Sequence, residues 1–215
     1  DVIVVRYASP NTTAVTSGSG DTITLATSVN AKNGDPFIIS DCQHADIFTA
    51  VTGNNKNGNV TTIKLNAGAL NKTYGADAEV APLKYVAYYI RKSDGHNNLY
   101  RNVVNGVAGK LEVQNAEPLL EGVEDLQVLY GEDLDGDGSK IRYVAADTAD
   151  LDMKHVTSVR LSLLLSSVDN NLTSGDQKYW LNGELKTVAN DKNSGKKLLR
   201  SFTTTIKVRN KGIGL

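Results

Sequence analysis

The sequence is poor in the features that mark several large classes of protein. It has one cysteine, Cys42, so no disulfide bond can form within the chain. Its 23 basic and 24 acidic residues nearly cancel, which argues against a nucleic-acid-binding surface or a polybasic membrane patch. The most apolar segment, residues 161–168, is far shorter than the roughly 18 residues that a membrane-spanning helix needs. Because 40% of the residues are hydrophobic, we expect a folded chain with a core. The balanced charge leaves proteins as the expected partners, or no partner at all.

The common signatures of catalysis and cofactor binding are missing as well. There is no Gly-x-Ser-x-Gly nucleophile motif, no Gly-x-Gly-x-x-Gly after an expected strand and no phosphate-binding loop. The three histidines, His44, His96 and His155, are too far apart to form the i, i+4 pair of a zinc-binding helix, and we expect them at the surface or at strand ends. We therefore expect no enzymatic activity and no required cofactor.

What the sequence does have is alternation of apolar and polar residues, which is typical of half-buried β-strands. The two clearest strands are expected over residues 158–166 and 201–209, and shorter ones near residues 23–25 and 63–65. The unbroken apolar run at residues 2–5 fits a strand that is covered on both faces.

Turn residues divide these strands and set the expected organisation. Residues 85–91 and 99–101 are expected to pair as a hairpin, and a short turn or helix is expected after Pro118, ended by Gly122. Polar stretches predict surface loops at residues 9–20, 53–59, 169–177 and 189–197. We therefore expect residues 1–215 to form one mostly β domain, built of antiparallel sheets with long loops.

One acidic motif could bind a metal ion. Asp133, Asp135 and Asp137 alternate in the sequence DLDGDG, the form that opens calcium-binding loops. In such a loop alternate carboxylates reach one hard cation, the glycine at the sixth position permits a sharp turn, and Ser139 would add its backbone carbonyl.

The twelfth position of this motif departs from the calcium-binding pattern. Val144 stands where a bidentate glutamate is needed, which excludes a complete EF-hand unless Asp147 or another residue completes the ligands. Two interpretations therefore stay open: a calcium site in an incomplete loop, or a solvated acidic turn between the apolar run 123–130 and a strand expected at residues 141–145.

Several short sequence segments along the chain resemble successive motifs of the PilW family of minor pilins, which are components of type IV pili. They are DVIVVRYA at residues 1–8, ISDC at 39–42, LYR at 99–101, LEGVEDLQVLYG at 120–131 with the acidic loop after it, residues 156–165, and RSFTTTIKVRN at 200–210. Together they span nearly the whole chain, and residues 121–138 are the most specific part.

The resemblance implies an α+β pilin fold, in which a leader and a long hydrophobic helix precede residue 1 and the β-rich head packs on that helix. It implies a role in priming the pilus and capping its tip, with other minor pilins and a tip adhesin as partners, and so a role in cell adhesion and twitching motility. The protein would lie in the inner membrane with a periplasmic head before assembly, and afterwards in the extracellular pilus. The head without its helix would be a monomer, and Cys42 would pair with a cysteine near the end of that helix. Composition alone suggests the alternative that Cys42 is a buried, unpaired thiol.

Two other functions remain as alternatives. A minor pseudopilin of a type II secretion system shares the implied architecture, although the sequence phrases favour the pilus. An exported carbohydrate-binding β-module would use exposed aromatic side chains, and the candidates are Tyr85, Tyr88, Tyr89, Tyr100, Tyr179 and Trp180. Most of these tyrosines alternate along expected strands, which favours packing within the sheet.

Overall fold

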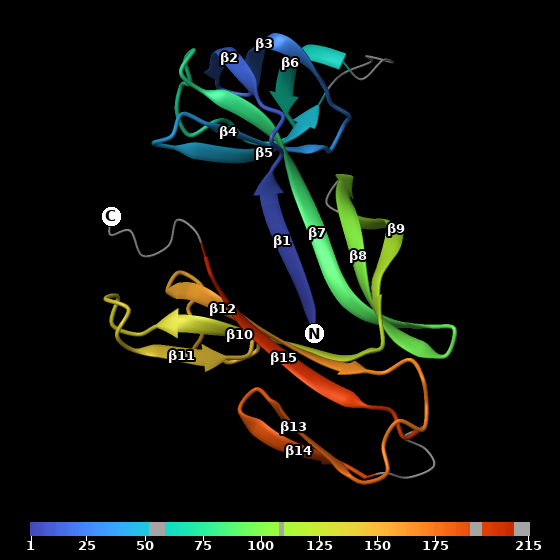
Figure 1. Ribbon diagram of the computed structural model, residues 1–215. Coiled ribbons are helices and arrows are strands. Elements are labelled where there is room, and N and C mark those ends of the chain that lie inside the picture. Colours follow the sequence, from blue (N-terminus) through green and yellow to red (C-terminus); the bar gives the residue numbers. More distant parts are fainter. Residues whose placement is uncertain (52–58, 108–109, 190–194, 209–215) are drawn as a thin grey trace. The chain divides into compact units, whose positions relative to one another are not determined.

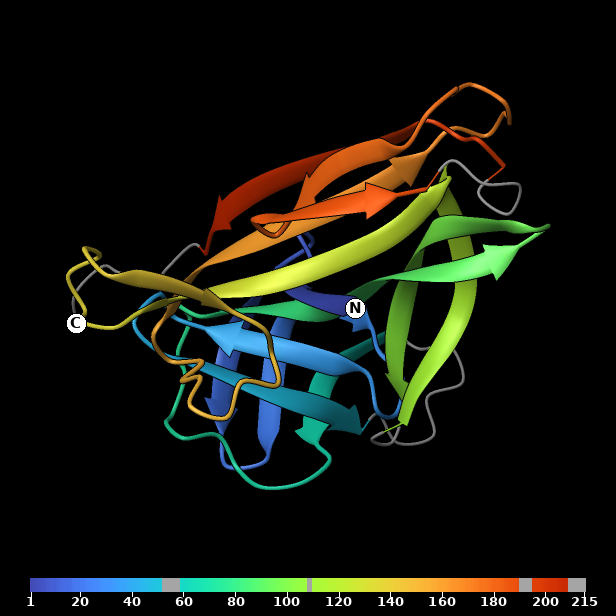
Figure 2. The ribbon, with the colours of Figure 1, turned by 90° about the horizontal axis from the view of Figure 1, so that it is seen from below.

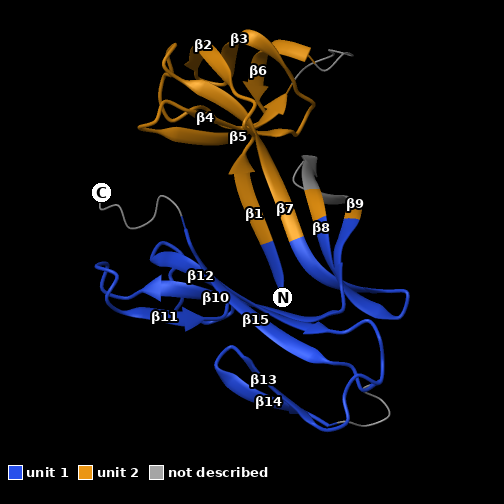
Figure 3. Cartoon of the chain, viewed as in Figure 1, with its two compact units in different colours: residues 1–3, 88–101, 117–215 blue, residues 4–87, 102–116 orange. Residues whose placement is uncertain are grey.

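A computed structural model describes residues 1–51, 59–107, 110–189 and 195–208, and these residues form β-strands without a helix (Figure 1). The chain divides into two compact units (Figure 3): unit 1 comprises Asp1–Ile3, Tyr88–Arg101 and Glu117–Leu215, and unit 2 comprises Val4–Ala87 and Asn102–Ala116. The expectation of mostly antiparallel β-structure is confirmed. The expectations of a single domain and of an α+β pilin fold stay predictions.

Three long strands contribute residues to both units: β7 (Glu79–Ser93), β8 (His96–Val107) and β9 (Lys110–Glu121). The hairpin expected between β7 and β8 is confirmed, and its turn is made by Asp94 and Gly95, both with positive φ. Two positive φ values are what a tight hairpin turn requires. In the described part of the chain, no helix could span a membrane.

Unit 2 is built around a closed ring of strands. Its members are β2 (Thr13–Ser19), β3 (Thr22–Asn30), β4 (Pro36–Ser40), β5 (Ala45–Val51), β6 (Asn59–Leu65) and the first part of β7. They pair antiparallel in the order β2-β3-β6-β5-β4-β7, and Thr13 pairs with Val80, so β7 returns to β2 and closes the ring.

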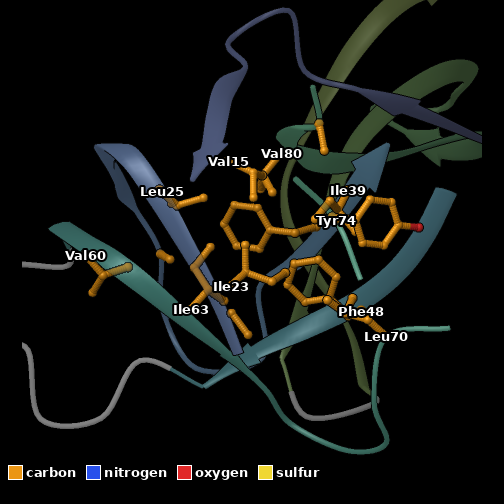
Figure 4. Close-up of a cluster of buried hydrophobic side chains, with 14 residues drawn as sticks. Val15, Ile23, Leu25, Ile39, Phe48, Val60, Ile63, Leu70, Tyr74 and Val80 are labelled. Carbon is orange, nitrogen blue, oxygen red and sulfur yellow. The ribbon is translucent and has the colours of Figure 1, made fainter. Parts of the chain in front are cut away.

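Side chains fill the interior of this ring (Figure 4). Alternate residues of each strand point inward, and Ile23, Ile39 and Ile63 are completely buried. The rings of Phe37 and Phe48 lie 6.0 Å apart in a stacked arrangement. The strands expected near residues 23–25 and 63–65 are thereby confirmed, and the ring is a packed core.

Two expectations for the N-terminal part of the chain are wrong. Residues 9–20 are not one loop, because β2 runs through them and buries Val15; its small and polar residues concealed the strand. The run at residues 2–5 does form a strand, β1 (Val2–Ala8), but it is not covered on both faces. Val2 is 60% exposed and Val4 49% exposed, since β1 pairs with β7 outside the ring.

Unit 1 contains a four-stranded antiparallel sheet and a separate hairpin (Figures 1 and 2). The sheet has the order β11-β10-β12-β15, with β10 (Val123–Asp133), β11 (Ile141–Val144), β12 (Val156–Ser166) and β15 (Leu199–Lys207). The hairpin consists of β13 (Gln177–Leu181) and β14 (Glu184–Val188). The strands expected over residues 158–166, 201–209 and 141–145 are confirmed in their described residues.

The turn or helix expected after Pro118 is wrong, because β9 continues as a strand to Glu121. Proline is tolerated there because β9 is the last strand of its sheet, and an edge strand does not need every backbone N–H. Gly122 then redirects the chain into β10: its φ is 75°, and a Cβ at this position would lie 2.4 Å from the Ser166 carbonyl oxygen. Residues 53–58 of the loop expected at 53–59, part of the loop expected at 189–197, and the end of the segment at 200–210 lie outside the described residues, whereas Asn59 already belongs to β6.

Candidate functional site

The acidic motif forms the connection between β10 and β11, as expected from its position between the apolar run 123–130 and the strand expected at residues 141–145. Asp133 is the last residue of β10 and pairs with Ile141, the first residue of β11. The loop is closed by a backbone hydrogen bond in which Leu134 N donates to Lys140 O at 3.0 Å. Gly136 and Gly138 have φ values of 78° and 82°, a conformation that residues with a Cβ rarely adopt.

The loop brings the three predicted carboxylates together. Asp133, Asp135 and Asp137 each offer an oxygen atom within 4.8 Å of the others, with Asp133 buried and the other two exposed. The two oxygens of Asp133 accept hydrogen bonds from Gly136 N and Gly138 N, both at 3.0 Å. This arrangement holds the Asp133 carboxylate at the base of the loop.

Ser139 bonds to both exposed carboxylates. Its hydroxyl donates to Asp135 Oδ2 at 2.7 Å, and its backbone N–H donates to Asp137 Oδ1 at 2.8 Å. The hydroxyl hydrogen bond is the main reason why the pKa of Asp135 is lowered to about 2. Asp135 therefore carries its negative charge at any physiological pH, and Lys140 Nζ lies 4.0 Å away.

This geometry is compatible with both interpretations of the motif. A converging set of carboxylates suits a hard cation such as calcium, while the backbone and hydroxyl donors would also stabilise a solvated acidic turn. Val144 pairs with Tyr130 in the β10–β11 ladder, so the twelfth position of the motif belongs to a strand. The calcium site and the carbonyl contribution of Ser139 stay predictions.

A second feature of unit 1 is an apolar face on its four-stranded sheet. Residues paired across antiparallel strands point to the same side of a sheet, so the register defines this face. Its members, which we call the apolar face, are Leu126, Val128, Val159, Leu161, Leu163, Leu165, Phe202 and Ile206.

Burial of the apolar face falls from one side of the sheet to the other. Leu126 and Val128 on β10 are buried, and the members on β12 are half-buried. On β15, Phe202 is 56% exposed and Ile206 is 52% exposed. The alternation at residues 201–209 predicted a half-buried strand, and the exposure of these two apolar side chains shows that this part of the prediction is wrong. Period-two alternation shows which residues share a face but does not show what covers it.

The opposite face of β12 is polar and more deeply buried. Ser158, Ser162 and Ser166 are buried on it. The Tyr143 hydroxyl lies 3.2 Å from Ser158 Oγ, and the Arg160 guanidinium lies 3.5 Å from the centre of the Tyr143 ring. These contacts lower the pKa of Tyr143, chiefly through the hydrogen bond with Ser158. Small side chains on β12 therefore make room for Tyr143 and Arg160.

The aromatic residues considered for carbohydrate binding are partly used in packing. Tyr89 and Tyr100 stack across β7 and β8 with ring centres 6.1 Å apart, and the Arg91 guanidinium lies 4.1 Å from the centre of the Tyr100 ring. Trp180 is different, because it is 61% exposed on the β13–β14 hairpin.

The histidines lie where the sequence predicted them. His44 is in the loop between β4 and β5, His155 directly precedes β12, and both side chains are mostly exposed. His96 is the first residue of β8.

Cys42 lies in the same β4–β5 loop as His44. It is exposed, so the alternative of a buried thiol is wrong, and its φ is 69°. Its pairing with a cysteine upstream of residue 1 stays a prediction.

Comparison with known families identifies the family to which the chain belongs. The family model of type IV pilus-assembly protein W (PilW) matches residues 87–210, more than half of the sequence. The chain belongs to the PilW family. The resemblance is thereby confirmed, and the matched region contains the acidic loop and the whole apolar face. No curated protein and no solved structure matches the chain.

PilW membership gives the chain a role in type IV pilus assembly, and so places it in the cell envelope or the pilus. The match begins at Ala87 within β7, so the ring strands β2 to β6 lie outside it.

Proposed function

We propose that this PilW-family chain is the head of a minor pilin that helps to prime the type IV pilus and forms part of its tip complex. Its role is structural, with no enzymatic activity and no required cofactor. The observation that carries the proposal is the family match, which covers the sheet that bears the apolar face. A large exposed apolar patch marks a surface that packs against another element of an assembly, and an apolar sheet face is such a surface.

The apolar face supports a contact with another hydrophobic element. Phe202 and Ile206 are each more than half exposed, and covering such a side chain is worth on the order of 1 kcal/mol. The family resemblance supplies the occupant, a hydrophobic N-terminal helix packed on the head. Other minor pilins and a tip adhesin are then the partners of the assembled protein, in the inner membrane first and later in the pilus.

The proposal is tested by deleting the gene in its native host and restoring it on a plasmid. We expect the deletion to reduce surface pili and twitching motility while secretion of type II substrates stays normal. Loss of secretion with normal pili would instead support the pseudopilin alternative. If neither pili nor secretion changes, the chain is not needed for either fibre and the proposal is wrong.

We also propose that Asp133, Asp135 and Asp137 bind one calcium ion, with Ser139 contributing its carbonyl oxygen. The support is the convergence of three carboxylate oxygens, one of them from a buried side chain. Because the loop has no bidentate glutamate, binding should be weak, with a Kd of about 10⁻⁴ to 10⁻³ M, as in extracellular calcium modules. The ion would order the β10–β11 connection and would take no part in chemistry.

A further inference from the structure

The outer edge of β15 has the properties of a site for strand addition. β15 is the last strand in the order β11-β10-β12-β15. It pairs with β12 over nine consecutive residue pairs, from Ser158↔Lys207 to Ser166↔Leu199, without a register shift. It is therefore a long, regular strand whose second side has no partner strand in the described part of the chain.

The direction of the backbone groups along β15 follows from one hydrogen bond. Val208 N donates to Thr157 O at 2.8 Å, which continues the β12–β15 ladder by one pair. In an antiparallel ladder the residues that bond to the partner alternate with those that point away. Residues 202, 204 and 206 therefore bond to β12, whereas Ser201, Thr203, Thr205 and Lys207 direct their N–H and C=O groups outward.

A glutamine side chain confirms this direction at the beginning of the strand. Gln177 Oε1 accepts a hydrogen bond from Leu199 N at 2.9 Å, and Gln177 Nε2 donates to Lys197 O at 2.5 Å. Its amide therefore fills the outward positions of residues 197 and 199 much as the peptide group of another strand would. The available edge starts beyond it, at Ser201.

The remaining edge has little of the usual protection against pairing. Edge strands are commonly blunted by proline, by bulges or by charged residues along their length. Between Ser201 and Ile206, β15 contains no proline, no β-bulge and no charged residue, and its side chains are mostly exposed. A strand added at this edge would extend the apolar face beside Phe202 and Ile206, which are each more than half exposed.

We propose that this edge of β15 binds an extended strand from a different protein, one with acidic residues near its ends and apolar residues at alternate positions. Charge decides the partner: β15 carries Arg200 and Lys207 and no acidic residue. Pairing with a second copy would bring positive charges together, whereas an acidic strand would complement them. The expectation that the partner is a component of the same pilus rests on the proposed function, but strand addition itself does not.

A peptide probe and amide hydrogen exchange test the proposal on the 215-residue chain. The probe is a nine-residue peptide that alternates valine and threonine between two terminal glutamates. Without the peptide, the amides of residues 202, 204 and 206 should exchange slowly, and those of Thr203, Thr205 and Lys207 should exchange fast. With the peptide, the second group should slow at least tenfold, because only these amides face the added strand.

Substitutions at one position separate backbone pairing from side-chain contact. Thr205→Pro removes an outward N–H without removing a bond to β12, and proline is tolerated in that position of an edge strand. Thr205→Val loses the same hydroxyl but keeps the N–H. We expect Thr205→Pro to weaken peptide binding at least tenfold and Thr205→Val to bind like the unmodified chain.

The other outcomes overturn the proposal. They are the absence of alternating protection at millimolar peptide, equal binding by Thr205→Pro and Thr205→Val, and stronger binding of a peptide that ends in lysines. Protection that depends on protein concentration without peptide would show self-pairing and exclude a distinct partner. The gene-deletion test reads pili rather than peptide binding, so the proposed function and strand addition can fail separately.

Discussion

Gly131 lies so close to Ser158 that a Cβ on Gly131 would be 2.2 Å from the Ser158 Oγ. The two residues face each other across β10 and β12. The same Cβ would be 2.9 Å from the Tyr143 ring, whose hydroxyl lies 3.2 Å from Ser158 Oγ. The absence of a side chain at Gly131 is therefore what lets Tyr143 pack against Ser158.

This contact predicts that Gly131→Ala destabilises unit 1. The added methyl group must displace Tyr143 or Ser158, and overpacking of this kind typically costs about 1–3 kcal/mol. Denaturant unfolding measures the change in the free energy of unfolding. Gly175→Ala is the matched control, because a Cβ there meets nothing within 4 Å, and its effect should stay within about 0.5 kcal/mol. Equal stability of the two variants would contradict the packing described.

The acidic loop predicts weak calcium binding. Titration calorimetry should detect binding with a Kd of about 10⁻⁴ to 10⁻³ M, and calcium should raise the melting temperature modestly because it binds the folded state. Asp135→Ala should abolish both effects. Asp169→Ala, in a separate exposed loop, should leave them unchanged. No heat and no shift in melting at millimolar calcium would leave the acidic turn as the correct interpretation.

The hydrogen bond from Ser139 predicts a pH effect at Asp135. The folded-state pKa of Asp135 is about 2, below its ordinary value of 3.8, so the carboxylate contributes stability that is present above about pH 4 and is lost as the pH falls toward 2. Ser139→Ala should raise the pKa of Asp135, while Ser139→Thr, which keeps the hydroxyl, should not. Carboxyl chemical shifts followed against pH measure this directly. An Asp135 pKa that does not respond to Ser139→Ala would refute the assigned cause.

The proposed helix contact predicts how the head behaves alone. The 215-residue chain should sediment as a monomer and bind the heads of neighbouring minor pilins weakly, because the proposed contact needs a hydrophobic helix packed on the head. Joining such a helix to the chain should raise these affinities. Sedimentation and surface-based binding measure both states, and equally tight binding in the two would argue against a joining helix.

Local patterns predicted much of the sheet in unit 1 but little of the ring in unit 2. Alternating residues gave the positions of β12 and β15 because a long apolar alternation suits a strand and does not suit a helix. β2 was missed because it buries only a few small residues, and its strand state depends on partners far away in the sequence.

The candidate sites could likewise be predicted only in part from the sequence. The position of the acidic loop between two strands could be predicted, because aspartate and glycine mark turns. Its internal hydrogen bonds to Ser139 could not, since they depend on loop geometry. The exposure of Phe202 and Ile206 was also unpredictable, because it depends on β15 being an edge strand.

The closure of the ring also sets an order of events during folding. During synthesis, Thr13 on β2 can pair with Val80 on β7 only after the strands between them have been synthesised. Pairings between residues far apart in the sequence form slowly. The entropy cost of closing the intervening loop rises only gradually with its length. In a chain synthesised from its N-terminus, β2 therefore lacks its β7 partner, and the ring stays open, until β7 has been synthesised. We therefore expect the ring to become stable only once β7 has joined it, and expect the interval before closure to be the time when the ring strands are most prone to aggregate.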